Sequence, residues 1–256
     1  MWDERATAHA SSQYYDLDAV VAGRDCLRPW EDEELGAVAG LDLIHLQCHI
    51  GTDTVAWARR GASVVGLDFS AVALDTARQL ARRCALPIEW VQADVYDAVA
   101  AVGGREFDVV YTGIGALGWL PDLARWAEVA RRLLRPGGVL YVVEVHPLWV
   151  ALGEDGKTLC EDAIAADFRR WDNPDQGSYA APDAKFRNTE SYERLHTIAD
   201  LLSAVLEVGM QIELFHEFDV TPAPTAWLER RPDGLYHFRE GSHRFPVVYS
   251  LLASRP

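Results

Sequence analysis

Lysine is almost absent from this chain of 256 residues, and the sequence is poor in positive charge as a whole. Lys157 and Lys185 are its only lysines, and 24 basic residues stand against 39 acidic ones, which gives a formal charge of −15 at pH 7. Nucleic-acid binding depends on lysine and arginine side chains that neutralise phosphates. The composition therefore argues against a nucleic-acid partner, and the arginines are scattered rather than gathered in a basic stripe.

Paired cysteines and long apolar runs are also missing. The four cysteines form no CxxC pair, which fits reduced thiols better than a disulfide framework or a zinc site. No stretch approaches the length of a membrane span, and the charged N-terminus has no apolar core of a signal peptide. We expect a cytoplasmic protein without a membrane partner, and the acidic residues show no convergence that predicts a metal site.

What the sequence does contain is an alternation of short β-branched runs with longer amphipathic segments, which is typical of parallel strands joined by helices. It predicts an α/β, Rossmann-like, doubly wound sheet. The expected strands are Asp42–Gln47, Ser63–Asp68, Ile88–Gln92, Phe107–Thr112, Gly138–Val145, Gln211–Phe218 and about 246–253. The expected helices are Thr52–Arg60, Ala71–Arg83, Trp119–Leu134 and about 197–208.

The turn after the first strand, Gln47 to Gly51, holds one glycine where a pyrophosphate would need several, because backbone N–H groups must approach the phosphates. A dinucleotide is therefore disfavoured. Asp68 nevertheless ends the second strand about 20 residues on, where a carboxylate can bind both hydroxyls of a ribose. Asp94 ends the next strand, where it can meet an adenine edge. Ribose and adenine without pyrophosphate indicate an adenosyl nucleoside.

The segments HLQCHIGTDT, GLDFS, QADVYD and FDVVYTGIGALGWLPDLARWAEVARRLLRPGGVLYVVE together resemble the class I S-adenosylmethionine-dependent methyltransferases. The resemblance implies S-adenosyl-L-methionine as cofactor. It also implies that Gln47 and His49 replace some of the missing glycine contacts. The other cofactor-binding residues that it implies in this part of the chain are Gly51, Asp68, Phe69, Asp94, Val95, Thr112 and Gly113.

The later segments, from GSYAAPDAKF to FPVVYSLLASRP, resemble a bacterial small-molecule subgroup of that family. This implies a seven-stranded, mostly parallel sheet whose last strand is antiparallel. The N-terminal residues resemble the subgroup's lid, with Tyr14, Arg24 and Arg28 as candidate cofactor contacts and Tyr15 as a candidate substrate contact. The predicted division is an N-terminal helical lid at 1–40, a cofactor-binding core at 41–145, an inserted substrate cap at 146–195, and the rest of the core at 196–256 with a second insertion at about 219–243.

The chemistry predicted for this site is methyl transfer to a small molecule of bacterial specialised metabolism. Methyl transfer is an in-line displacement, so the protein mainly aligns the reactants and excludes water. For an oxygen acceptor, which we favour, a histidine can serve as base near neutral pH. His146, just past the fifth strand, and His196, at the start of a later helix, are the predicted catalytic residues. Trp149, Trp171, Tyr179 and Trp227 are predicted to wall the acceptor pocket.

Other functions stay open at this point. The acceptor atom can be nitrogen or carbon, and the acceptor can be a protein. An NAD(P)-dependent oxidoreductase would share the strands and Asp68, but a short-chain dehydrogenase needs a tyrosine four residues before a lysine, which neither lysine has. A non-catalytic S-adenosylmethionine-binding protein is a further alternative. The chain is expected to be a monomer or a homodimer.

Overall fold

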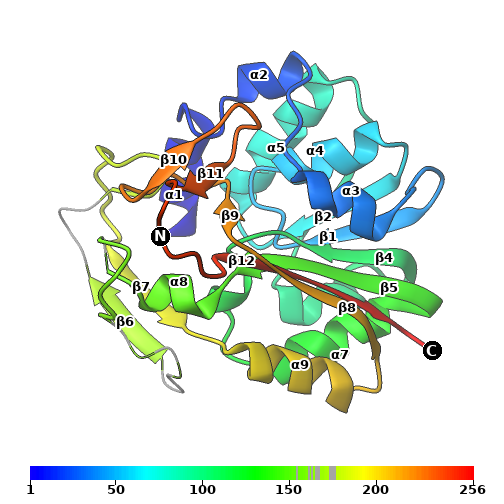
Figure 1. Ribbon diagram of the computed structural model, residues 1–256. Helices are drawn as coiled ribbons and strands as arrows, with labels where there is room; N and C mark the ends of the chain where they lie inside the picture. The colour runs from blue at the N-terminus through cyan, green and yellow to red at the C-terminus, as the bar shows by residue number, and fades with distance from the viewer. Residues whose placement is uncertain (154, 161, 163, 165–167, 173–176) are drawn as a thin grey trace.

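One central sheet organises the chain, and the computed structural model describes residues 1–153, 155–160, 162, 164, 168–172 and 177–256 (Figure 1). Within these residues the sheet has seven strands in the order β3-β2-β1-β4-β5-β12-β8. Strand β12 runs antiparallel to both of its neighbours, and the first five strands of the order are parallel. The predicted fold class is confirmed. The strands are β1 (Asp42–Leu46), β2 (Ser63–Asp68), β3 (Glu89–Gln92), β4 (Phe107–Thr112), β5 (Leu134–Val145), β8 (Gln211–Phe218) and β12 (Val248–Ser254).

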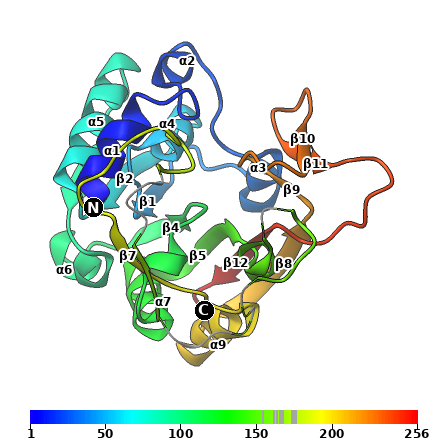
Figure 2. The same cartoon turned by 90° about the vertical axis from the view of Figure 1, so that its left-hand side faces the viewer.

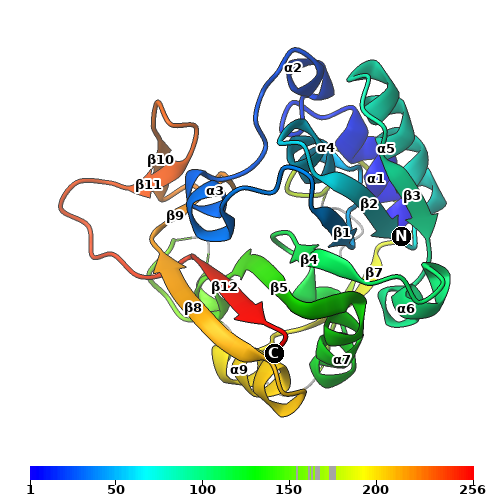
Figure 3. The same cartoon turned by 90° about the vertical axis from the view of Figure 1, so that its right-hand side faces the viewer.

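Helices cover both faces of this sheet (Figures 1 and 3). Because successive side chains of a strand point to opposite faces, Ile44 and Leu46 enter one core and Leu43 enters the other. The first core lies beneath α7 (Leu123–Leu133) and α9 (Ile198–Glu207), and the second lies beneath α3 (Pro29–Leu35) and α4 (Thr52–Arg59). Trp57 and Trp126 are the largest fully buried side chains in these two cores. The helices after β1 are α4 (Thr52–Arg59), α5 (Ala71–Arg83), α6 (Ala98–Ala101), α7 (Leu123–Leu133) and α9 (Ile198–Glu207), with short 3-10 turns η1 (Val95–Asp97) and η2 (Leu117–Trp119).

Residues 1–40 carry the helices α1 (Trp2–Ala10), α2 (Leu17–Val21) and α3 (Pro29–Leu35). Helix α1 lies beside α5, as Figure 2 shows, and packs against the turn that follows β1. Buried contacts among Ala6, Ile50 and Ala73 fix this position. The N-terminal helices therefore form part of the wall around the first turn.

Short strands occupy the segments that the sequence leaves irregular. After α8 (Pro147–Ala151), β6 (Phe168–Asp172) pairs antiparallel with β7 (Glu190–Arg194). Later, β9 (Val220–Thr221), β10 (Leu228–Arg230) and β11 (Tyr236–Phe238) form a second small sheet. Strands of two to five residues carry too little alternation to be recognised in a sequence.

Two predicted boundaries are wrong. Helix α7 begins at Leu123 and not at Trp119, because Pro121 interrupts the segment and the Asp122 side chain caps the helix by accepting the N–H of Arg125. Strand β5 begins at Leu134 and not at Gly138. The Arg-Pro-Gly-Gly segment forms part of the strand as an irregularity, at which the pairing of β5 with β4 shifts its register. The other predicted strands and helices agree with the structure to within two residues.

Candidate active site

A cavity of about 1280 Å³ opens at the carboxyl ends of β1, β2 and β4, which is where open α/β sheets bind their ligands. Ligand pockets usually measure roughly 300–1,000 Å³, so this volume has room for two molecules side by side. Many of the residues predicted from the sequence meet in its wall. They are Tyr14, Tyr15, Arg24, Arg28, Gln47, His49, Asp68, Phe69, Gly113, Trp149, Tyr179 and Trp227.

The turn between β1 and α4 has the positive φ angles that are usual for glycine, although most of its residues carry side chains. Gln47, His49 and Gly51 all have positive φ, at 56°, 50° and 80°. A side chain in this region costs on the order of 1–2 kcal/mol, so contacts around the turn must hold Gln47 and His49 in place. The chain thus keeps the path of a glycine-rich turn while placing two polar side chains at the cavity.

Gly51 itself has a packing reason to be glycine. A Cβ at this position would lie 2.6 Å from the Trp90 ring and 2.8 Å from the Cβ of Ala77. Gly51 is not among the wall residues of the cavity, and its predicted cofactor contact stays a prediction.

Asp68 is the buried carboxylate of the site, at 7% exposure. Its two oxygens accept the backbone N–H groups of His49, at 2.9 Å, and Ser70, at 2.8 Å. Burial raises the pKa of Asp68 above its usual range, while these N–H groups act in the opposite direction. A carboxylate offers about four acceptor positions, so Asp68 can accept further hydrogen bonds from a ligand. Phe69, next in the chain, is 53% exposed and offers a ring at the same edge of the cavity.

A polar group that the sequence did not reveal lies beside Gly113. A Cβ built on this glycine would lie 3.3 Å from Oδ2 of Asp53 and 3.4 Å from Nε2 of His45, so both polar atoms crowd the same point of the wall. Nδ1 of His45 is hydrogen-bonded to Thr54 at 2.8 Å. Gln47 adds the oxygen Oε1, which has no hydrogen-bond partner among the described residues. Asp53 could have been found as an acid in the first turn of a helix that starts at the predicted turn.

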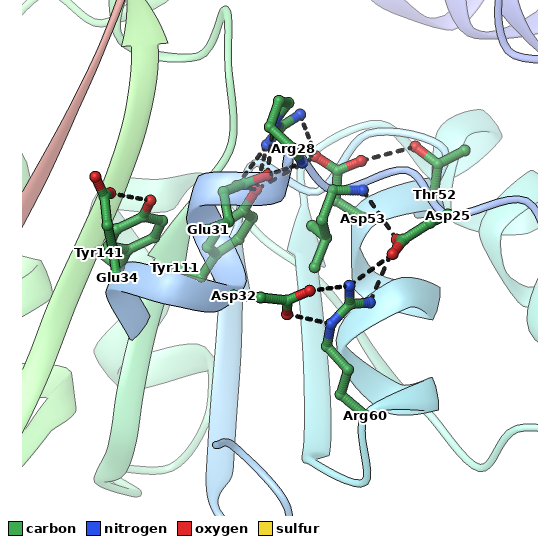
Figure 4. A network of polar contacts seen from close by, with 11 residues as sticks. Asp25, Arg28, Glu31, Asp32, Glu34, Thr52, Asp53, Arg60, Tyr111 and Tyr141 are labelled. Atoms are coloured by element: carbon green, nitrogen blue, oxygen red, sulfur yellow. Dashed lines mark hydrogen bonds and ion pairs between the residues drawn. The ribbon is translucent and has the colours of Figure 1, made fainter. Parts of the chain in front are cut away.

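Arg28 is buried in an ion-pair network rather than free in the cavity (Figure 4). Its guanidinium contacts Glu31 at 2.5–2.6 Å, the Tyr111 hydroxyl at 2.8 Å and Asp53 at 3.4 Å. The Tyr111 hydroxyl in turn donates to Glu31 at 2.8 Å. Arg28 is 4% exposed and Glu31 and Tyr111 are 0% exposed, so the network fixes α3 to the end of β4.

Glu144 at the end of β5 holds the loop that follows β4. Its buried carboxylate accepts backbone N–H groups at 2.6–2.8 Å from Gly115, Ala116, Leu117 and Val145. Gly115 and Ala116 line the cavity. Glu144 therefore shapes the cavity without reaching into it.

The two histidines predicted to be catalytic lie elsewhere. His146 caps α8 through Nδ1, which accepts the N–H of Leu148, and its Nε2 lies 2.9 Å from Glu217. His196 is buried, with Nε2 at 2.8 Å from the carbonyl oxygen of Leu120. Neither is among the wall residues of the cavity. Both rings instead make hydrogen bonds to neighbouring protein groups.

Four further predicted residues also lie outside the described wall of the cavity. Asp94 is exposed and caps η1, and Val95 is buried beneath it. Thr112 is fully buried at the end of β4. Trp171 belongs to the β6–β7 pair. Their predicted contacts stay predictions.

The aromatic side of the cavity is formed by segments far apart in sequence. The hydroxyls of Tyr15 and Tyr179 are hydrogen-bonded to each other, and the ring of Tyr14 stands edge-on to both at centroid distances of 5.1 and 5.3 Å. Trp149 and Trp227 lie together at 5.4 Å. Burial raises the pKa of Tyr14, so its hydroxyl stays protonated. These rings make a largely apolar wall with hydroxyl groups at intervals.

Burial keeps three histidines of this region neutral. It lowers the pKa of His9 and of His45 to about 4 and that of His49 to about 3, and the positive charge of Arg5 adds to the effect at His9. An unfolded chain takes up these protons near pH 6.5. Because the folded-state pKa values are lower, the stability they contribute is fully present above pH 6.5 and is lost as the pH falls from there toward 4.

We predict that lowering the pH from 7.5 to 5.5 decreases the free energy of unfolding by roughly 1.4 kcal/mol for each of these three histidines. Urea unfolding at the two pH values measures the decrease. His9→Gln should lose about a third of the decrease that these three histidines cause, whereas His243→Gln, at an exposed position, should keep all of it. An unchanged pH dependence in His9→Gln would contradict the prediction.

Among the described residues, no group of three or more histidine, cysteine, aspartate or glutamate side chains is arranged to hold a metal ion. In the same part of the chain, every helix is too short or too polar to cross a membrane.

Comparisons with known proteins agree with this geometry. Residues 44–140 match a protein family described as "Methyltransferase domain". The ubiquinone biosynthesis O-methyltransferase of Stutzerimonas stutzeri is 34% identical over 117 residues, which cover 46% of this chain and 49% of that protein. The chain thus matches about half the length of the curated relatives.

Solved structures resemble the chain over most of its length. The S-adenosylmethionine dependent methyltransferase of Mesorhizobium loti has a TM-score of 0.61 at 23% identity, covering 92% of this chain and 100% of that one. A SAM-dependent methyltransferase of Methanosarcina mazei has a TM-score of 0.60 at 17% identity, covering 90% of this chain and 98% of that one. At these identities the likeness establishes the shared fold.

Proposed function

We propose that this chain transfers a methyl group from S-adenosyl-L-methionine to a small-molecule acceptor, because residues 44–140 match the family described as "Methyltransferase domain". The family predicted from the sequence is confirmed for this part of the chain. The observation that carries the proposal is a cavity whose wall contains both the buried carboxylate of Asp68 and a set of aromatic rings. Its volume accommodates a nucleoside cofactor and a second molecule.

Asp68 and Phe69 hold the nucleoside in this proposal. The Asp68 carboxylate accepts hydrogen bonds from the ribose hydroxyls, and the exposed ring of Phe69 stacks on the adenine. Asp94 and Val95, at the end of the neighbouring strand β3, border the far side of the adenine.

The methionine end of the cofactor then lies beside β1 and β4. Its ammonium group can donate three hydrogen bonds, and the wall supplies three acceptors: Oε1 of Gln47, Nε2 of His45 and the carboxylate of Asp53. Arg28 supports this group indirectly, since it holds the Asp53 carboxylate. S-Adenosylmethionine supplies a methyl group made electrophilic by the sulfonium charge, and these residues orient it.

The acceptor lies against Tyr14, Tyr179, Trp149 and Trp227. A wall of this composition suits a flat or apolar molecule with a few polar groups. We favour an oxygen acceptor, which is supported by the relatives named as O-methyltransferases. The bulk of the wall also excludes water from the reacting atoms, which an in-line methyl transfer requires.

The experiment that tests the function is calorimetric titration with S-adenosylhomocysteine, with NAD and NADP in parallel, followed by transfer of a labelled methyl group to a panel of small phenols, acids and amines. Binding of S-adenosylhomocysteine alone, with label in an acceptor, is the expected result. Preference for a nicotinamide nucleotide would overturn the proposal in favour of an oxidoreductase. Tight nucleoside binding without transfer to any acceptor, including proteins, would indicate a binding protein.

We expect His146→Gln and His196→Gln to retain kcat within about twofold, because both rings already bind protein groups and lie outside the described cavity wall. The pH dependence of kcat should be the same in both variants and the wild type. A loss of about 100-fold in either variant would restore that histidine as the catalytic base.

A further inference from the structure

His9 joins three segments that are far apart in the sequence. Nδ1 of His9 lies 2.9 Å from Nε2 of His49 in the first turn, and its Nε2 lies 2.9 Å from Oγ of Ser178. The ring is 0% exposed, and His9 is not among the wall residues of the cavity. It therefore acts on the site through its two hydrogen-bond partners and through the rings of Tyr15 and Tyr179, whose centroids lie 5.4 and 5.0 Å from its own.

The partner in the turn is the residue that orients Asp68. The backbone N–H of His49 donates to Oδ2 of Asp68 at 2.9 Å. His49 has a φ of 50°, which a residue with a side chain rarely adopts unless its surroundings impose it. The His49 side chain is held by the hydrogen bond to His9 and by ring contacts with Trp2 and Tyr15, each at 5.8 Å between centroids.

We infer that His9 is a positioning residue for ribose recognition, which acts through His49 on the Asp68 carboxylate. The inference rests on the proposed function. The hydrogen bond from His9 holds the His49 ring at Nε2 and thereby fixes the backbone of His49. The backbone N–H of His49 in turn orients Oδ2 of Asp68. The outer oxygen positions of Asp68 are then aimed at the ribose hydroxyls.

Helix α1 has other anchors, so removal of this one hydrogen bond leaves the helix in place. Asp3 accepts the hydroxyl of Ser70 at 2.6 Å, and Glu4 accepts the backbone N–H of Arg187 at 2.8 Å and the side-chain amide of Asn188 at 2.5 Å. Figure 2 shows the chain that leads into β7 passing close to α1. The effect of His9 on the cofactor site can therefore be separated from the docking of the helix.

Two substitutions separate the two hydrogen bonds of His9. The amide of asparagine can replace Nδ1, so His9→Asn keeps a partner for His49 and loses Ser178. The longer glutamine places its amide near Nε2, so His9→Gln keeps Ser178 and loses His49. Ser178→Ala removes the outer bond to His9, together with the side-chain acceptor of the Ala181 N–H at 3.1 Å, and serves as a matched control.

The test measures affinity for S-adenosylhomocysteine and for an analogue that lacks both ribose hydroxyls. We expect His9→Gln to weaken binding of S-adenosylhomocysteine about tenfold, as is typical for a residue that orients a ligating group, and to leave binding of the analogue within about twofold. His9→Asn and Ser178→Ala should stay within about twofold for both ligands. In turnover, His9→Gln should raise KM for the cofactor and leave kcat at saturation unchanged.

His49→Ala cuts the same bond from the other side and provides the test should His9→Gln fail to fold. It should lose the same hydroxyl-dependent affinity, and the double variant should lose no more than either single one. Equal losses for both ligands would show a merely structural role and overturn the inference, as would unchanged affinity in His9→Gln. Absence of S-adenosylhomocysteine binding by the wild type would overturn the proposed function and the inference with it.

Discussion

Asp68→Ala is expected to weaken binding of S-adenosylhomocysteine by at least about 100-fold. Each hydrogen bond between a ribose hydroxyl and a carboxylate contributes roughly 1.5–3 kcal/mol, and the substitution removes two of them. It also frees the N–H groups of His49 and Ser70, which Asp68 now accepts at 2.9 and 2.8 Å. Calorimetric titration of the variant and the wild type measures the loss.

Asp75→Ala is the matched control for this prediction. Asp75 lies on the exposed face of α5, the helix that follows Asp68, where it pairs with Arg78 at 2.8 Å. Its removal should change the affinity by less than about twofold, because an exposed ion pair at this distance from the cavity contributes little. If Asp68→Ala binds as tightly as Asp75→Ala, the ribose does not lie at the end of β2 and the placement of the cofactor is wrong.

Arg28→Met is expected to lower the free energy of unfolding by about 3–5 kcal/mol, because it leaves the buried carboxylate of Glu31 without its ion-pair partner. Urea unfolding at pH 7.5 measures the change. Arg60→Met is the control, since Arg60 bridges Asp25 and Asp32 nearer the surface (Figure 4). For Arg60→Met we expect a loss of no more than about 1 kcal/mol.

The double variant Arg28→Met/Glu31→Gln separates the ion pair from the packing of the arginine stem. Removing the carboxylate charge should restore at least half of the lost stability, because the main penalty is the unpaired charge of Glu31. If Arg28→Met keeps the stability of the wild type but loses cofactor binding, Arg28 contacts the cofactor directly, as the sequence suggested, and the network of Figure 4 is secondary.

The strands of the sheet and the helices between them could be predicted from the sequence because both follow from local periodicity, whereas the antiparallel last strand was implied by the family resemblance. Alternation of β-branched runs and amphipathic segments marks β1, β2 and β4 and the helices between them, and the position of Asp68 at the end of β2 follows directly. Boundaries near Pro121 and Pro136 could not be predicted as well, because a proline permits several local solutions and packing against neighbouring strands selects one.

The site could be predicted only in part. The residues of the strand ends, such as Asp68 and Gly113, line the cavity as expected because parallel strands bring their carboxyl ends to one edge. His146 was chosen by the same rule, but its ring turns to Leu148 and Glu217 instead. Proximity to a strand end does not fix the direction of a side chain, which is decided by its hydrogen-bond partners.

The sequence by itself determined the α/β fold, the match of residues 44–140 to the methyltransferase domain and the strand-end position of Asp68, since each is encoded in residues close together in the chain. The tertiary structure alone decided that Arg28 meets Tyr111, 83 residues away, and that His9 meets His49 and Ser178, 40 and 169 residues away. No local pattern specifies such pairs. They form because folding removes these polar groups from water, and each must then find a hydrogen-bond partner among whatever the packed segments bring within reach.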